Sequence, residues 1–258
     1  MSVIYSIQAI QIIDSRGTPT VSCKVTLENG ICATSMVPSG ASTGSREALE
    51  LRDSNAAYLG KGVNKAVTNI HEIIAPALIG MDVTNQQDID EKMIALDGTS
   101  SKSKLGANAI LGVSLAVLDA GSKTLGLPLY KYINQVFDHI NGEKPKMQMP
   151  TPMLNIINGG EHADNNIDIQ EFMIMPVGAN NFSQAMQWAT EIYSDLKCIL
   201  NTKGLSTSVG DEGGFAPNLQ SNQEAIELII QAIQNNNLTE GRDVGIACLL
   251  YTSDAADE

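Results

Sequence analysis

NIINGGEHADNNIDIQEFMIMP, the stretch Asn155–Pro176, places one histidine, two glutamates, two aspartates, four asparagines and one glutamine between apolar residues. Its apolar flanks, Met153-Leu154 and Phe172–Met175, indicate that the chain enters a core on both sides. An unpaired polar group in a core costs about 1 to 3 kcal/mol, so these polar residues are expected to be partnered or functional. A second run of the same character, GDEGGFAPN at Gly210–Asn218, suggests a single shared site.

The residues around these two runs predict strands that alternate with helices. Residues 182–200 have helical periodicity, and SNQE at 221–224 has capping-box spacing directly ahead of a second apolar helix. Apolar runs predict strands at 153–157, 172–175 and 244–250, and Val209 is expected to end another short strand. Such alternation favours a parallel α/β construction with polar groups at the strand ends, as in barrel enzymes.

The first half of the chain predicts an α+β domain. Three alternating segments, joined by DSRG at 14–17 and ENG at 28–30, predict an antiparallel three-stranded meander. The polar stretch NGEKPK at 141–146 contains Gly and Pro and is expected to link this domain, residues 1–140, to the next. The strands are expected at 3–13, 18–27 and 31–37, and helices at 47–52, 63–79, 89–96 and 105–125.

The composition limits the classes of function. A formal net charge of -13 repels polyanions, so neither nucleic acid nor an anionic membrane is an expected partner. An anionic small substrate would need a bound divalent cation or local Lys and Arg residues. The four cysteines lack C-x-x-C spacing, which suggests a reducing compartment. No secretory signal precedes the first strand and the apolar stretch 105–118 is too short to span a bilayer, so we expect a soluble, cytoplasmic protein.

The two polar runs hold the candidate chemistry. His162 alone fits a hydrogen-bonded loop histidine, and Asp211-Glu212 alone fits a polar turn bounded by glycines. Gln170-Glu171, in contrast, directly precedes an apolar run and is expected at a strand boundary. If Glu171 and Glu212 converge, they disfavour simultaneous ionisation, so one of them can hold a proton at neutral pH and act as a general acid. Neither run has H-E-x-x-H or EF-hand spacing, and the absence of G-x-S-x-G argues against covalent serine catalysis.

The loop PSGASTG at residues 38–44 has two interpretations. Its small residues suit a simple connection between a strand and a helix. They also suit a mobile loop that closes over a ligand, as catalytic lids do.

Five motifs in order resemble the enolase family. The likeness runs from the N-terminus to about Ala247, and at the loop Ser42–Arg46 it is similar to bacterial members. It implies an enolase N-terminal α+β domain, with a three-stranded antiparallel meander plus helices, followed by the first part of a TIM-like α/β barrel. The motifs are SGASTGSREALELRD at 39–53, KLGANAI at 104–110, NGGEHA at 158–163, QEFMI at 170–174 and GDEGGFAPN at 210–218.

The resemblance also implies an activity and a set of roles. Enolases, which are usually homodimers, interconvert 2-phospho-D-glycerate and phosphoenolpyruvate by removing water, with two Mg2+ ions as cofactors. By this resemblance Glu212 is the general acid that assists departure of the hydroxyl, and Glu171 lies beside it. His162, Gln170 and Glu171 contact the substrate, and Ser42 ligates the second magnesium from the lid loop.

The resemblance is incomplete towards the end of the chain. The family's first-magnesium carboxylates, lysine base and phosphate-binding cations have no match here, and Ile246–Leu249 carries no carboxylate where the family has one. We therefore expect an incomplete barrel domain at 141–247, in a truncated chain that is inactive alone. The alternative is a non-catalytic binding or dimerising fragment. Residues 248–258, CLLYTSDAADE, resemble no enolase segment and are expected to be a tail that arose as a sequencing artefact, unless they are an ordinary strand with an acidic end.

Overall fold

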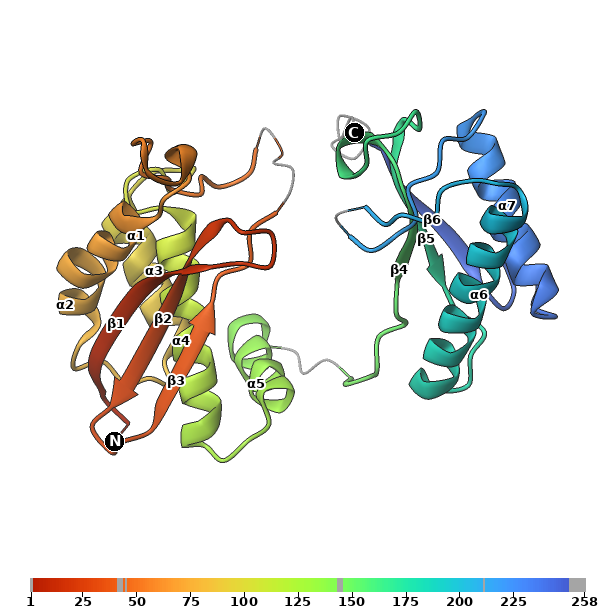
Figure 1. Cartoon of the computed structure of the whole chain (residues 1–258). Helices are drawn as coiled ribbons and strands as arrows, with labels where there is room; N and C mark the ends of the chain where they lie inside the picture. Colours follow the sequence, from red (N-terminus) through yellow and green to blue (C-terminus); the bar gives the residue numbers. More distant parts are fainter. Residues whose placement is uncertain (1, 41–43, 45, 143–145, 211, 251–258) are drawn as a thin grey trace. The chain divides into compact units, whose positions relative to one another are not determined.

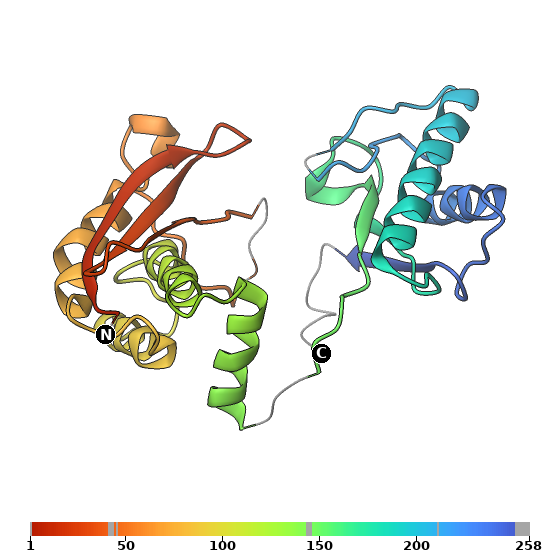
Figure 2. The same ribbon diagram turned by 90° about the horizontal axis from the view of Figure 1, so that it is seen from below.

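The chain forms two compact units, Met1–Met147 and Gln148–Glu258 (Figures 1 and 2). The structure, a computed structural model, describes residues 2–40, 44, 46–142, 146–210 and 212–250. The division between the units falls just after the polar stretch that the sequence indicates as a linker.

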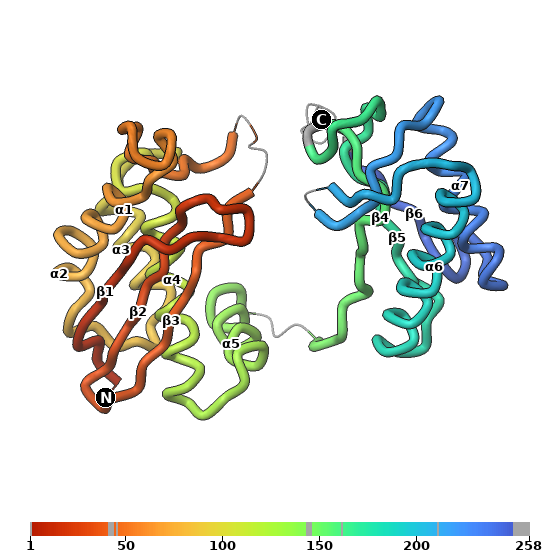
Figure 3. Tube along the Cα trace, viewed as in Figure 1, coloured from red at the N-terminus to blue at the C-terminus, as the bar shows by residue number. Residues whose placement is uncertain are grey.

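The first unit contains the predicted meander. Its strands β1 (Ile4–Ile13), β2 (Pro19–Leu27) and β3 (Cys32–Met36) pair antiparallel in the order β1-β2-β3, as the tube in Figure 3 shows. The central strand β2 is buried over most of its length, because it has a neighbour on each edge and a helix on one face. This arrangement confirms the antiparallel meander and the α+β class of the first unit.

Helix α4 (Ala107–Thr124) covers the sheet and packs against β2 and β3. The packing is close, since a Cβ added to Gly112 would lie 3.2 Å from Val37 Cγ2. At the same point the Ser35 hydroxyl donates a hydrogen bond of 2.6 Å to the Gly112 carbonyl. The small Ala and Gly residues of this helix therefore bring it close to its neighbours.

The remaining helices surround this core. The predicted helix at 63–79 is continuous but changes its winding, because a π-helical turn in its middle directs His71 toward the sheet. There the Ala9 amide of β1 donates to His71 Nε2 at 2.9 Å. The elements are a 3-10 turn at Ala57–Gly60, α1 (Asn64–Asn69), the π turn Ile70–Ile74, α2 (Ala75–Leu78), α3 (Gln86–Asp97) and α5 (Leu129–Asn141).

Among the described residues no single helix is long and apolar enough to cross a membrane. Helices α4 and α5 reach the required length and composition only together, and a bend of 104° separates them.

The predicted helix at 47–52 is wrong. Residues 48–53 form neither helix nor strand, and their backbone groups bond to distant parts of the chain instead of to one another. The Leu49 amide donates to Ser101 O at 2.7 Å, and Leu51 exchanges two bonds of 3.1 Å with the side chain of Asn108. Tertiary hydrogen bonds thus outweigh a local helical preference of only a few tenths of a kcal/mol per residue.

The second unit is a three-stranded sheet with two helices on one face. Its strands β4 (Leu154–Asn158), β5 (Ile169–Met175) and β6 (Gly245–Leu250) lie in the order β4-β5-β6. Helices α6 (Phe182–Thr202) and α7 (Asn222–Asn235) follow β5 and precede β6 in the chain, and they pack on each other. Phe172 and Ile174 of β5 join the apolar core under these helices, so the alternate residues Glu171 and Met173 face the other side of the sheet.

The expected parallel pairing of neighbouring strands is wrong, because β5 runs antiparallel to both β4 and β6. The connection from β4 to β5, residues 159–168, is too short for a helical crossover and simply reverses the chain. Two successive helices connect β5 to β6. One helix would return the chain for a parallel strand, whereas the second carries it back again and makes β6 antiparallel. Val209 forms only an isolated bridge with Phe215 instead of the end of a strand.

The capping box ahead of α7 is expected to make a measurable contribution to the stability of the second unit. Ser221 Oγ accepts a hydrogen bond of 3.2 Å from the Glu224 amide, which satisfies one of the free amides at the start of the helix. We expect Ser221→Ala to lower the free energy of unfolding of the second unit by about 1 kcal/mol. Urea titration followed by the fluorescence of Trp188, the single tryptophan and a residue of α6, measures this unit. Ser221→Asn keeps an acceptor and should retain most of the stability; an equal loss in both variants would contradict the capping role.

Candidate active site

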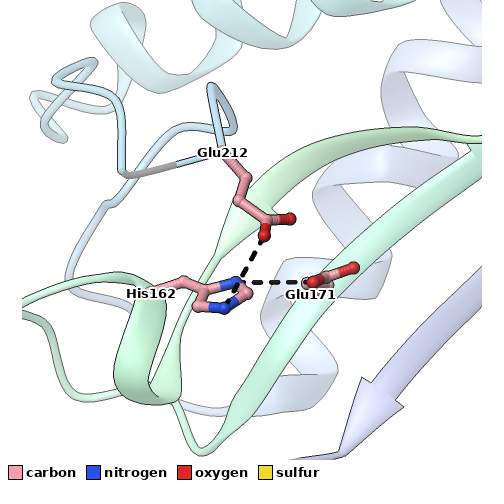
Figure 4. Close-up of side chains that lie close together, drawn as sticks. All are labelled: His162, Glu171 and Glu212. Carbon is pink, nitrogen blue, oxygen red and sulfur yellow. Dashed lines mark ion pairs between the residues drawn. The ribbon is translucent and has the colours of Figure 1, made fainter. Parts of the chain in front are cut away.

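Three titratable side chains from separate segments converge at one end of the second sheet (Figure 4). His162 belongs to a short 3-10 turn, Gly160–His162, that follows β4. Glu171 lies near the start of β5, and Glu212 lies in the loop between α6 and α7. The end of β4, the start of β5 and the end of β6 meet here, so the site lies where strand ends gather.

The segment that carries Glu212 is held on the edge of β4. Phe215 donates to the Ile156 carbonyl and accepts from the Asn158 amide, both at 2.9 Å, so it extends the sheet by one residue. Just before it, the Gly210 amide donates to Gly214 O at 2.8 Å and closes the loop. Tyr193 of α6 stacks on Phe215, with 4.3 Å between ring centroids, and its hydroxyl donates to Gly213 O at 2.8 Å. Glu212 therefore projects from a tight loop whose base is anchored in the core.

Two glycines permit this close approach. A Cβ on Gly214 would collide with Asn158 Oδ1 and lie 3.0 Å from the Ile157 nitrogen. A Cβ on Gly210 would lie 2.5 Å from the His162 carbonyl. Any larger residue would push the loop away from the strand end, and Glu212 would move with it.

His162 lies between the two carboxylates. Its Nδ1 is 3.4 Å from Glu171 Oε1, and its Nε2 is 3.8 Å from Glu212 Oε1. Gln170 Nε2 lies 2.6 Å from His162 Nε2; an amide nitrogen can only donate, so the imidazole nitrogen accepts this bond. In the neutral ring the proton then resides on Nδ1 and faces Glu171. The imidazole is 4% exposed, so this orientation is fixed by its surroundings.

Burial, followed by the hydrogen bond and the negative charge of Glu212, raises the pKa of Glu171 from 4.5 to about 7. The Glu171 side chain is 11% exposed and that of Glu212 is 43% exposed. Two such carboxylates cannot both be ionised without strong repulsion, so the pair holds a proton near neutral pH. The site therefore contains one buried and one accessible member of a single acid–base pair.

Buried amide groups lie beside this pair. Within the described part of the chain, the side-chain nitrogen and oxygen of both Asn155 and Asn158 have no hydrogen-bond partner, and neither does His162 Nδ1. Asn158 is fully buried and pairs with Glu171 across the two strands. The side chain of Asn158 thus fills the space between the strand end and the glycines of the Glu212 loop.

The structure brings together four of the residues singled out in the sequence: His162, Gln170, Glu171 and Glu212. Asp164 and Asp168, the two aspartates of the same polar run, are exposed. Ser42, Asp211 and the tail from 251 to 258 lie outside the described residues. On β6 the residue opposite Glu171 is Leu249, so this strand brings no carboxylate to the site. Tyr193 was missed, because it sits in an ordinary helical pattern and only its tertiary contact with Gly213 reveals it.

An α+β unit, followed by a sheet-and-helix unit that gathers a histidine and two carboxylates at its strand ends, defines a two-domain protein of mixed α and β structure with an acid–base site. Residues 4–133 match the family model "Enolase, N-terminal domain", and residues 146–256 match "Enolase, C-terminal TIM barrel domain". The chain is 54% identical over 246 residues to the enolase of Desulfotalea psychrophila (strain LSv54 / DSM 12343). That match covers 95% of this chain and 56% of the relative. The chain belongs to the enolase family, and its second unit is part of the family's barrel domain.

The proton on Glu171 links stability to pH. The ordinary pKa of a glutamate is 4.5 and that of Glu171 is raised to about 7, so between these values the folded unit binds more protons than the unfolded chain. The contribution of this group to the free energy of unfolding is therefore full below pH 4.5 and is lost as the pH rises towards 7. Glu212→Gln removes the repulsion but leaves the burial, so we expect a smaller loss over the same range. Urea titrations followed by Trp188 fluorescence measure this; equal pH dependence in both proteins would contradict the coupling.

Gly214 provides a steric test of the loop. We expect Gly214→Ala to lower the free energy of unfolding of the second unit by about 1 to 3 kcal/mol, because the added methyl overlaps Asn158 Oδ1. Gly245→Ala is the matched control, since its methyl would meet only ordinary contacts at 3.8 and 3.9 Å from Met175. If Gly214→Ala were as stable as Gly245→Ala, the close approach of the loop to Asn158 would be refuted.

Proposed function

We propose that this chain supplies the proton-donating residues of the active site of a glycolytic enolase. Such an enzyme is a hydro-lyase that converts 2-phospho-D-glycerate reversibly into phosphoenolpyruvate and water. The observation that carries the proposal is the coupled pair Glu171 and Glu212, one of which holds a proton near neutral pH. Loss of water from this substrate breaks the C2–H and C3–O bonds and forms the C2=C3 double bond. Hydroxide is a poor leaving group, so a proton must reach the C3 oxygen as that bond breaks.

The two carboxylates divide this task by their exposure. Glu171 is the buried member, so its environment favours the protonated form and it stores the proton. Glu212 is the more exposed member and shares the proton through a hydrogen bond, so it can deliver the proton to a substrate in the open part of the site. Glu212 is therefore the general acid, and Glu171 is the buried partner that supplies it with the proton.

His162 and Gln170 contact the substrate and orient the pair. The bond from the Gln170 amide fixes the imidazole plane, so the Nδ1 proton is directed at Glu171. A ring held in this way keeps its two nitrogens next to the two carboxylates. This role follows from the family resemblance and from the contacts of the two side chains.

Family membership implies a divalent metal, and we propose Mg2+. The described site residues do not fit this ion by themselves, because Mg2+ requires about six oxygen ligands and the cluster offers two carboxylates and an imidazole that is already bonded to Gln170. Leu249 adds no oxygen at the end of β6. Ser42, which the resemblance assigns to the second magnesium, lies outside the described residues. We therefore derive no step through the metal.

The other properties of the whole protein are also proposed on family grounds. The chain spans 56% of the length of the relative it matches, so the complete active unit is inferred from enolases in general. We propose a homodimer in the cytoplasm that acts on small phosphorylated acids and binds neither nucleic acid nor membranes. The net charge of -13 is consistent with the last point, because it repels anionic polymers and surfaces.

A chimera tests the proposal. Residues 1–247 of this chain replace the matched part of the Desulfotalea psychrophila enolase, and formation of phosphoenolpyruvate is followed with Mg2+ present. We expect the chimera to turn over and its Glu212→Gln variant to lose about 10²- to 10⁴-fold in kcat, because the proton donor is gone. We expect the 258-residue chain alone to form no detectable product, since the described site residues include no lysine to accept the C2 proton.

Glu227→Gln is the matched control for the chimera, because Glu227 is an exposed glutamate on α7 outside the site. This variant should retain full activity. A folded chimera without activity, beside an active parent enolase in the same assay, would overturn the proposed function. Full activity in the Glu212→Gln chimera would overturn the assignment of the acid.

A further inference from the structure

Two adjacent asparagines connect the segment that carries His162 to the segment that carries Glu212. We infer that Asn165 and Asn166 are positioning residues, an amide clamp that sets the distance between the imidazole and the accessible carboxylate. The inference rests on the proposed function for its consequence, because it concerns the acid pair of that reaction. Neither residue is among the groups to which the resemblance gives a role.

The clamp consists of four hydrogen bonds, three of which cross between the two segments. Asn165 Nδ2 donates to Asn158 O at 2.9 Å and to Pro217 O at 3.2 Å, so it joins the end of β4 to the chain after the Glu212 loop. Asn166 makes a reciprocal pair with Leu219. Its Nδ2 donates to Leu219 O at 2.5 Å, and its Oδ1 accepts from the Leu219 amide at 3.0 Å. A reciprocal pair fixes both the distance and the rotation of the two segments.

Apart from two longer bonds of 3.4 Å that join Asp168 and Ile169 to Asn222 at the start of α7, the other bonds of the His162 segment are local. Its backbone bonds run from His162 N to Gly159 O at 3.1 Å and from Gly160 N to Ile167 O at 2.8 Å, so they hold the turn to itself. Phe215 holds the base of the Glu212 loop to β4, but it does not hold the turn after β4. The clamp bonds Pro217 and Leu219, which are buried and follow Phe215 directly, to that turn. The separation of 3.8 Å between His162 Nε2 and Glu212 Oε1 therefore depends on the clamp.

The chemistry of the clamp requires amides. Each asparagine nitrogen faces backbone carbonyl oxygens, which a carboxylate in its place would repel. In this polar stretch the two asparagines bond to the Glu212 segment, whereas Asp168 accepts a bond of 3.4 Å from Asn222 Nδ2, at the start of α7. The same residues would be ordinary surface groups if the segment only connected two strands.

The test measures the titration of Glu171 in the complete 258-residue chain. Glutamate carboxyl carbons labelled with 13C are followed by NMR as a function of pH, in the unaltered protein and in an Asn165→Ala, Asn166→Ala double variant. The groups that face Glu171 are His162 and Glu212. We expect the midpoint to fall from about 7 towards 4.5 in the double variant, because Glu212 moves away and water enters. Glu212→Gln gives the reference fall for loss of the carboxylate alone.

Asn236→Ala is the matched control. Asn236 Nδ2 donates to Ala232 O at 2.8 Å, an amide bond in the same unit that stays within the end of α7. This variant should leave the midpoint of Glu171 unchanged even if it costs similar stability. Trp188 fluorescence shows whether each variant is folded. If the double variant does not fold, Asn166→Asp serves instead; it keeps the acceptor for the Leu219 amide and should give a partial fall.

An unchanged midpoint in a folded clamp variant, or an equal fall in Asn236→Ala, would overturn the inference. The readout needs no substrate, so it separates the clamp from the proposed reaction. An inactive chimera together with a shifted midpoint would overturn the proposed function and leave the clamp standing. An active chimera together with an unchanged midpoint in the folded clamp variant would overturn the clamp and leave the proposed function standing.

Discussion

The close approach of Glu171 and Glu212, whose carboxylate oxygens lie within 4.8 Å of each other and of the His162 imidazole, is the constraint on which the site in the second unit depends. Two carboxylates at this distance repel each other unless a proton lies between them, and burial of Glu171 increases the cost of its charge. The fold meets this constraint with an imidazole beside both carboxylates and with a loop narrow enough to bring Glu212 close. The glycines of that loop are required for the same reason, because they allow its backbone to touch Asn158.

The two faces of the sheet in the second unit have different roles, because one contributes stability and the other carries the site residues. Phe172 and Ile174 of β5 are buried with α6 and α7, and this apolar packing fixes the strand. Glu171 alternates with these residues along β5, so it faces away from the helices. Burial of a polar group under the helices would be unfavourable unless the group were hydrogen-bonded. The site can therefore hold a carboxyl with a raised pKa, because the opposite face of the same strand contributes the stability that holds it in place.

The sequence predicts most elements of the fold where local pattern and tertiary packing agree. The meander and most of the helices follow from periodicity, although α5 was not predicted, and the capping box at Ser221 marks the start of α7 to the residue. The helix at 47–52 fails because its backbone bonds go to Ser101 and Asn108, which no local window contains. The antiparallel direction of β6 could not be predicted from alternation alone, because it depends on whether one or two helices precede the strand.

The site residues divide in a similar way. His162, Gln170, Glu171 and Glu212 stand out because each is a polar group next to apolar or glycine-rich sequence, where an unpaired polar side chain would be costly. Asn165, Asn166 and Tyr193 do not stand out, because asparagine is ordinary in a loop and tyrosine is ordinary on a half-buried helix face. Their contribution lies in the partner atoms, the carbonyls of Gly213, Pro217 and Leu219.

These backbone partners explain why the supporting residues are less visible than the groups they support. A catalytic carboxylate must be a carboxylate, so its identity is written in the sequence. A positioning contact needs only a donor that reaches a carbonyl oxygen, and every residue of the chain has such an oxygen. Many pairs of residues can therefore make an equivalent contact, and the sequence does not single out one of them. The spacing of an acid–base pair is then set by contacts that only the three-dimensional structure identifies, here between two loops that lie about fifty residues apart.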